Sequence, residues 1–290
     1  MFLRAAALAF AAVILVARPA VGAPIKILAA ENFYGEAAAL IGGDAVTVES
    51  VLAAAGTDPH DFEPPPSVAR AVADADIVIL NGAGYDHWME HLVEAAAGDG
   101  TAVINIADLM GVSDGGNPHV WYSPDAMPAL ANALTEHLIS RDAANAAAYT
   151  ANRDAFLSTL AQLDARIAEV RAEFAGAPAA ATEPVFGYMA EAMGLAMQNE
   201  AFQTSIMNET EPSARDIAAM EDDLRQGRVK VLFYNAQVED AFTQTLADIA
   251  RDAGVPTVAV TETQPAGKTY LEWMLNAVDA TAKALSDKAS

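Results

Sequence analysis

The sequence contains no cysteine, so neither a disulfide bond nor a cysteine-ligated metal site can stabilise its fold. For the same reason we expect no lipid anchor on a lipobox cysteine. Basic residues are also few: 16 Lys and Arg stand against 39 Asp and Glu, which gives a formal net charge of −23. Such a charge repels phosphate backbones and attracts cations, so we predict that the protein binds no nucleic acid.

Long apolar runs are absent except at the N-terminus, and that run is too short to cross a membrane. It covers Ala5–Ala17, about a dozen residues, whereas a membrane-spanning helix needs roughly 20. It follows Arg4 and is succeeded by the small residues Val21-Gly22-Ala23, the pattern of a secretory signal peptide. We therefore predict that residues 1–23 are a signal peptide cleaved near Ala23; a buried N-terminal strand or helix is the alternative.

The first half of the remaining chain alternates short apolar runs with amphipathic segments. We predict strands at Ile25–Ala30, Val46–Val51, Ile77–Leu80 and Thr101–Ile106, and helices at Phe33–Ile41, at Ser67–Ala73 and from an N-cap at Asp86 to Ala97. Alternation of this kind is typical of a parallel sheet with helices on both faces.

A long segment without glycine or proline follows, from Ser140 to Phe174. Its apolar residues recur at steps of three and four, which predicts one helix of roughly 35 residues. Such a helix suits a rigid connection between two lobes, although a coiled-coil dimer would also use one. Alternation then resumes, with helices at Pro212–Gln226, Val238–Arg251 and Tyr270–Leu285 and strands at Val229–Tyr234 and Thr257–Thr261.

These patterns predict the α/β class, with two α/β lobes that contain parallel sheets and are joined by a long rigid helix. The expected division is a signal peptide at 1–23, an N-terminal lobe at 24–139, a linking helix at 140–175 and a C-terminal lobe at 176–290.

Two of the five histidines lie in similar proline-stiffened loops. His60 occurs in Asp58-Pro59-His60-Asp61 after the second predicted strand, and His119 in Asn117-Pro118-His119-Val120-Trp121 after the fourth. Proline restricts its own backbone and the residue before it, so each imidazole is presented from a stiff loop. Because ligands gather beyond the strand ends of open α/β sheets, His60 and His119 are candidate metal ligands. Two solvated loop histidines remain the alternative.

A different metal hypothesis comes from His87-Trp88-Met89-Glu90-His91, which matches the H-x-x-E-H pattern of some zinc metallopeptidases. Spacing of four puts both imidazoles on one helix face, with Glu90 placed to act as a general base. The alternative is a pair of solvated histidines near a helix start. No Walker A or G-x-G-x-x-G motif is present.

These motifs together resemble the zinc/manganese solute-binding proteins of bacterial metal ABC importers. The resemblance covers essentially the whole chain after residue 23 and is carried by Gly56–Pro64, Ala75-Asp76, Asn81-Gly82, Asn117–Trp121, Phe186-Gly187-Tyr188 and Glu211-Pro212-Ser213. It implies a metal-type periplasmic binding protein that carries Zn²⁺ or Mn²⁺ as its transported ligand. It also implies a membrane permease as partner, a monomeric state, a periplasmic location and no catalysed reaction.

By the same resemblance, the metal ligands are His60, His119, Glu183 and Glu262. This chain departs from the family pattern in having Pro184 after the third ligand and Glu rather than Asp at the fourth. The nearest substitutes for the fourth ligand are Glu209, Glu239 and Asp240.

The identity of the metal is left open by these residues. Two carboxylate donors shift preference toward manganese relative to a site with three histidines, but raw affinity favours zinc. The segment before His119, Ala107–Gly116, has no histidine, unlike the histidine-rich loop of many zinc-type members. Two other functions stay open: the metallopeptidase above, and a structural or adhesion protein whose metal site braces the fold.

Overall fold

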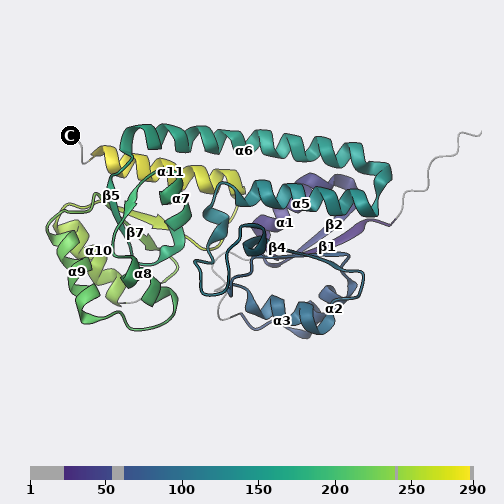
Figure 1. The fold of residues 1–290 in the computed structure, drawn as a ribbon, viewed down its shortest axis with the longest axis horizontal. Coiled ribbons are helices and arrows are strands. Elements are labelled where there is room, and N and C mark those ends of the chain that lie inside the picture. The colour runs from purple at the N-terminus through teal and green to yellow at the C-terminus, as the bar shows by residue number, and fades with distance from the viewer. Residues whose placement is uncertain (1–22, 54–61, 239–240, 288–290) are drawn as a thin grey trace, which may run out of the picture.

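Two parallel four-stranded sheets form the framework of the computed structural model, which describes residues 23–53, 62–238 and 241–287 (Figure 1). The first sheet has the order β2-β1-β3-β4 and the second the order β6-β5-β7-β8, so the two sheets have the same topology. The strands are β1 (Ile25–Glu31), β2 (Val46–Leu52), β3 (Ile77–Leu80), β4 (Ala102–Asn105), β5 (Pro178–Ala181), β6 (Ala196–Met197), β7 (Val231–Asn235) and β8 (Thr257–Val260). The prediction of two α/β lobes with parallel sheets is confirmed.

Helices cover both faces of the N-terminal sheet. Alternate residues of β1 point to opposite faces: Ile27 belongs to the buried cluster that includes α1 and α5, and Leu28 to the cluster that includes α2 and α3. The helices of this lobe are α1 (Asn32–Gly42), α2 (Pro66–Asp74), α3 (His87–Ala96), α4 (Ile106–Leu109) and α5 (Ala126–Arg141).

The C-terminal sheet is covered in the same way. One face packs in a cluster with α8, α9 and α10, and the other in the cluster that contains α7 and α11. The bounds are α7 (Gly187–Ala192), α8 (Glu200–Met207), α9 (Ala214–Arg225), α10 (Ala241–Asp252) and α11 (Tyr270–Asp287). Among the described residues, no helix combines the length and the apolar character that a bilayer span requires.

A single helix, α6 (Ala146–Phe174), runs across both lobes (Figure 1). Its buried residues recur every three to seven positions and face α1 and α5 on one lobe and α11 on the other. It has 29 residues rather than the roughly 35 expected. The difference lies at Asp142, where the chain turns back so that α5 and α6 pack against each other.

The turn at Asp142 has a local cause. Its carboxylate accepts hydrogen bonds from Asn145 Nδ2 at 2.6 Å and from Tyr149 Oη at 2.9 Å. Asp side chains that bond to nearby groups compete with helical backbone hydrogen bonds, and a 3₁₀ turn at Ala143–Asn145 replaces the expected helix. The sequence analysis did not predict this break, because the segment contains no glycine or proline that would mark the end of a helix.

Several elements of the second lobe were not predicted, namely β5, β6, α7 and α8. The strand β5 reads Pro-Ala-Ala-Ala, and alanine is depleted in strands. Ala180 and Ala181 are nevertheless almost fully buried, because β5 lies between β6 and β7. Burial inside a parallel sheet, which a local pattern does not show, therefore decides the conformation here.

The lobes share one core. A continuous buried cluster extends from the N-terminal sheet through α6 to the C-terminal sheet and α11. Aromatic rings join the lobes within it: the centroid of Phe33 on α1 lies 5.6 Å from that of Trp273 on α11, and Tyr122 lies 5.5 Å from Trp273. Aromatic pairs at such distances add to the free energy of area burial. The relative position of the lobes is therefore set by packing as well as by α6.

The buried face of α6 can be tested with one leucine. Leu163 is 2% exposed in the shared core, whereas Leu40 on α1 is 53% exposed. We expect Leu163→Ala to lower the free energy of unfolding by about 2–5 kcal/mol, because it removes buried methyl groups and leaves a cavity. Leu40→Ala, a matched change in another helix, should alter it by about 0.5 kcal/mol or less. Urea unfolding of the metal-free proteins measures both; equal losses would contradict the packing described.

Candidate metal centre

Three polar side chains meet where neighbouring strands of the C-terminal sheet end. Glu183 follows β5, Asn235 is the last residue of β7, and Glu262 follows β8. The carboxyl ends of parallel strands lie at one edge of a sheet, which is where such folds hold ligands. Asn235 Nδ2 donates to Glu183 Oε2 at 3.2 Å and to Glu262 Oε1 at 2.7 Å. The two carboxylates are thus joined through one amide.

His119 reaches the same place from the N-terminal lobe. It precedes a 3₁₀ turn at Val120–Tyr122 and is 2% exposed, with its ring packed 5.2 Å from that of Trp121 between centroids. Its Nε2 lies 3.8 Å from Oε2 of Glu262, which is itself 7% exposed. A buried imidazole of one lobe therefore faces a buried carboxylate of the other.

The tautomer of His119 follows from its neighbour Asn117. Asn117 Nδ2 donates to the carbonyl of Pro184 at 2.8 Å, so Asn117 Oδ1 is the acceptor on the other side. That oxygen lies 3.1 Å from the backbone nitrogen of His119 and 2.6 Å from its Nδ1, which therefore carries the proton. Nε2, which lies 3.8 Å from Glu262 Oε2, then carries the lone pair, as in metal-binding histidines that are held by a hydrogen bond at the other ring nitrogen.

The backbone that carries Glu262 is held from both lobes. Gln237 Oε1 accepts from the backbone nitrogens of Glu262 at 2.6 Å and Thr263 at 3.1 Å. From the other lobe, Tyr122 Oη donates to the carbonyl of Thr261 at 2.8 Å. Because the loop is fixed on both sides, the carboxylate of Glu262 is presented to His119 by well-supported backbone.

The four ligands expected from the resemblance are only partly placed by the structure. His60 lies outside the described residues. Of the other three, His119 and Glu262 face each other directly, and Glu183 is linked to Glu262 through Asn235. Among the described residues, no three His, Asp or Glu side chains form a group able to hold a metal ion by themselves. The described part of the site is thus a His–Glu pair with a second, amide-linked carboxylate.

A buried polar network lies behind His119. Asn81 is fully buried, and its Nδ2 donates to the carbonyl of Pro118 at 2.8 Å while its Oδ1 accepts from Tyr34 Oη at 2.7 Å. Asn81 therefore fixes the residue directly before His119. The backbone nitrogen of Asn81 in turn donates to Asp86 Oδ2 at 2.7 Å.

Asp86 does not have the expected function of a helix cap. It occupies the N-cap position of α3, but its side chain makes no capping hydrogen bond. Its carboxylate accepts instead from the backbone of the preceding loop, at Asn81 and Gly82. Burial raises the pKa of Asp86 to about 6, although these two backbone hydrogen bonds lower it. Burial, together with the charge of Asp86, also raises the pKa of Glu31 well above its usual range.

The H-x-x-E-H segment forms the start of α3, as expected, but it lies at the surface. His87 and His91 are exposed, and their ring centroids are 6.1 Å apart. Partial burial and the nearby charge of Asp114 raise the pKa of Glu90, whereas the two histidines lower it. No further His, Asp or Glu in the described part of the chain completes a metal site with this pair.

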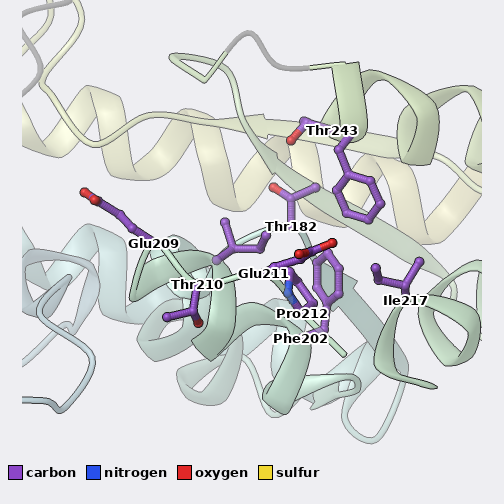
Figure 2. A pocket seen from close by; sticks show the side chains of 10 residues that line it. Thr182, Phe202, Glu209, Thr210, Glu211, Pro212, Ile217 and Thr243 are labelled. Atoms are coloured by element: carbon purple, nitrogen blue, oxygen red, sulfur yellow. The ribbon is translucent and has the colours of Figure 1, made fainter. Parts of the chain in front are cut away.

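Of the three substitutes considered for the fourth ligand, Glu209 lies among the described residues, and the structure does not favour it. Glu209 is exposed in the loop after α8, where it lines a cavity of about 400 Å³ with Thr182, Phe202 and Glu211 (Figure 2). In that view its carboxylate points away from Thr182 and Glu211. Glu239 and Asp240 lie outside the described residues.

Sequence reasoning did not identify Asn235, Gln237 or Asn117 as parts of the site. Each is an amide that binds a candidate ligand or the backbone next to one. A signal was available for Asn235, which directly follows the predicted strand Val229–Tyr234 in a sheet whose other strand ends carry the carboxylates. Amides of this kind are common in loops, however, so the pattern alone does not separate them from solvated residues.

Comparison with known proteins gives consistent results. A family model described as zinc-uptake complex component A, periplasmic, matches residues 27–284. The chain is 26% identical over 280 residues to the manganese-binding lipoprotein MntA of Halalkalibacterium halodurans, covering 91% of this chain and 90% of the relative. It is 27% identical over 289 residues to the manganese ABC transporter substrate-binding lipoprotein PsaA of Streptococcus anginosus, with the same coverage.

A solved structure supports the fold. The SBP FpvC of P. aeruginosa, in complex with Ni²⁺, has a TM-score of 0.74 and 24% sequence identity. The match covers 92% of this chain and 98% of that one. At this sequence identity, the structural similarity supports the fold alone.

The raised pKa of Asp86 predicts a pH dependence of stability. The folded protein holds the Asp86 proton more tightly than the unfolded chain does, so stability present below pH 4 is lost as the pH rises through about 6. We expect the free energy of unfolding of the wild type, relative to Asp86→Asn, to fall by about 2.5 kcal/mol between pH 4 and 7, out of a total of about 3 kcal/mol at roughly 1.4 kcal/mol per pKa unit. Urea unfolding of both metal-free proteins at several pH values measures this; parallel pH profiles would refute it.

Proposed function

We propose, on the premise that this chain belongs to the family of periplasmic zinc-uptake component A proteins, that it captures Zn²⁺ or Mn²⁺ and delivers the ion to the permease of an ABC importer. The observation that carries the proposal is the buried pair formed across the lobes by His119 and Glu262. Relatives whose names state manganese binding or metal ABC transport match over nine-tenths of the chain.

The distance within this pair fits a single ion between the two groups. Zinc bonds to imidazole nitrogen and carboxylate oxygen measure about 2.0–2.2 Å, so two ligands of one ion lie at most about 4.4 Å apart. The separation of 3.8 Å between His119 Nε2 and Glu262 Oε2 lies within that limit and is too long for a hydrogen bond. The fixed proton on His119 Nδ1 supports the same interpretation.

We propose His60, His119, Glu183 and Glu262 as the ligand set. Two neutral imidazoles and two carboxylates balance the charge of a divalent ion, so the buried complex has no net charge to desolvate. Glu183 is supported by its hydrogen bond to the same amide that holds Glu262. His60 is supported by its proline-flanked loop after β2 and by the family resemblance.

Capture without a catalytic step agrees with this architecture. The ligands come from both lobes, so the ion itself completes the contact between them. The exposed position of His87 and His91 argues against a metallopeptidase site. We therefore propose a binding protein rather than an enzyme. The net charge of −23 raises the local concentration of cations around the protein.

We further propose that the protein is exported, that residues 1–23 are removed, and that the mature protein is a monomer. The apolar run, Arg4 and the small residues up to Ala23 support export. Intact mass spectrometry of protein isolated from the periplasm should show a chain that begins at Pro24. A mass that retains the first 23 residues would argue against cleavage there.

The metal site can be tested by comparing two histidine substitutions. His119→Ala removes a proposed ligand, whereas His87→Ala removes a histidine of the H-x-x-E-H segment. We expect His119→Ala to weaken Zn²⁺ binding by at least about 100-fold, because one of four metal bonds is lost and Glu262 loses its partner across the lobes. His87→Ala should bind as the wild type does. Competition with a chromophoric chelator measures the affinities.

The outcomes of this comparison separate the functions considered. Loss of zinc in His87→Ala with retention in His119→Ala would reject the proposed site in favour of the surface histidines. Exchange of bound metal within minutes supports a carrier, whereas metal that leaves only on unfolding would indicate an ion that braces the fold.

A further inference from the structure

The topology of the C-terminal sheet puts one amide between the two proposed carboxylate ligands. The strand order β6-β5-β7-β8 makes β7 the neighbour of both β5 and β8. The register pairs Ala181 with Phe233 and Asn235 with Val260, so Asn235 ends β7 between the residues that lead to Glu183 and to Glu262. Its side chain is 2% exposed.

The orientation of this amide is determined by its surroundings. The backbone nitrogen of Gln237 donates to Asn235 Oδ1 at 3.0 Å, and a backbone N–H can only donate. The NH₂ group therefore faces the carboxylates, with 3.2 Å from Nδ2 to Glu183 Oε2 and 2.7 Å to Glu262 Oε1. One donor is available for each carboxylate, and a flipped amide would place its oxygen against both of them.

The amide has two physical effects. As a neutral donor between two like charges, it offsets the repulsion that would otherwise oppose keeping both carboxylates ionised and close together. It also occupies one oxygen of each carboxylate. In Glu262 this is Oε1, and the other oxygen, Oε2, is the one that lies 3.8 Å from His119 Nε2.

We propose, building on the proposed function, that Asn235 is a positioning residue that makes Glu183 and Glu262 bind metal through one oxygen each and thereby favours zinc over manganese. Two imidazoles and two single oxygens form a four-coordinate site, which suits the tetrahedral preference of Zn²⁺. Mn²⁺ prefers a higher coordination number with more oxygen donors, which a carboxylate supplies when both of its oxygens bind. The hydrogen bonds from Asn235 occupy one oxygen of each carboxylate, so these oxygens do not bind the ion.

Two substitutions remove the donors in different ways. Asn235→Leu keeps a similar volume without polar atoms, and Asn235→Asp keeps the acceptor for Gln237 but replaces the NH₂ group by an oxygen. We expect Asn235→Leu to lower zinc affinity by about 10–100-fold and to lower manganese affinity less, so that the zinc-to-manganese affinity ratio narrows by about tenfold. Both variants should show a mean zinc coordination number above four. Competition titrations with Zn²⁺ and Mn²⁺ salts and X-ray absorption of the zinc-loaded proteins measure these quantities.

A matched control is Asn152→Ala on α6, which removes the hydrogen bond from Asn152 Nδ2 to the carbonyl of Ile41 at 3.0 Å, away from the proposed ligands. It should keep the wild-type affinity ratio and coordination number. If Asn235→Leu does not fold, Asn235→Asp decides the question by its coordination number.

The result also separates this inference from the proposed function. Wild-type protein that binds neither ion would overturn the proposed function and the inference with it. A wild type that binds zinc with more than four ligands, or variants with the wild-type ratio and coordination number, would overturn the inference about Asn235 alone.

Discussion

Holding two carboxylates close together beside a buried imidazole, with Glu262 buried and Glu183 half-buried, is the constraint on which the rest of this structure depends. Burial penalises charge, and like charges at close range add to that penalty. The protein meets this cost with neutral amides rather than with cations: Asn235 lies against both carboxylates, and Asn117 against the ring of His119. A lysine or arginine in either place would stabilise the empty site but would compete with the incoming ion. Neutral amides hold the proposed ligands in place and leave their charge available to a cation.

The same strand order in the two lobes explains why the proposed ligands of the two lobes lie close together. Each parallel sheet gathers polar residues at the carboxyl ends of its strands, and the lobes are joined so that loops from both edges reach one place. The N-terminal lobe contributes His119 through a loop that Asn81 holds at Pro118. The C-terminal lobe contributes Glu183 and Glu262 from strands on either side of β7. A repeat that is not visible in residue identities is therefore visible in topology.

Much of the fold could be predicted from sequence, and the exceptions have physical reasons. Apolar runs in β1, β3 and β7 and the periodicity of α11 are strong local signals, and these elements were placed to within two residues at each end. The alanine-rich β5 was missed because only its burial between neighbouring strands makes it a strand. The helix α5 was not predicted, and the break between α5 and α6 was missed because it depends on the hydrogen bonds of one carboxylate, at Asp142. For the site, the structure places His119 and Glu262 close together, but Asn235 and Gln237, which hold Glu262, lie 27 and 25 positions before it and leave no periodic pattern.

The way the lobes are joined bears on how an ion could leave the proposed site. Separating the lobes as rigid bodies would expose the shared core, including Phe33 and Trp273, at about 25 cal/mol for each Å² of apolar surface. The loop between β8 and α11 is held mainly by hydrogen bonds instead. From the N-terminal lobe, Glu36 accepts from Gln264 Nε2 at 2.7 Å and from the backbone nitrogen of Tyr270 at 3.0 Å, and Tyr122 donates to Thr261. A bond between neutral groups contributes about 1 kcal/mol and one to the Glu36 carboxylate about 1.5–3 kcal/mol, so displacing the loop costs less than breaking the core. A displacement of this loop would separate Glu262 from His119 while the two sheets and α6 stay packed, which within the proposed function would open a route for the ion.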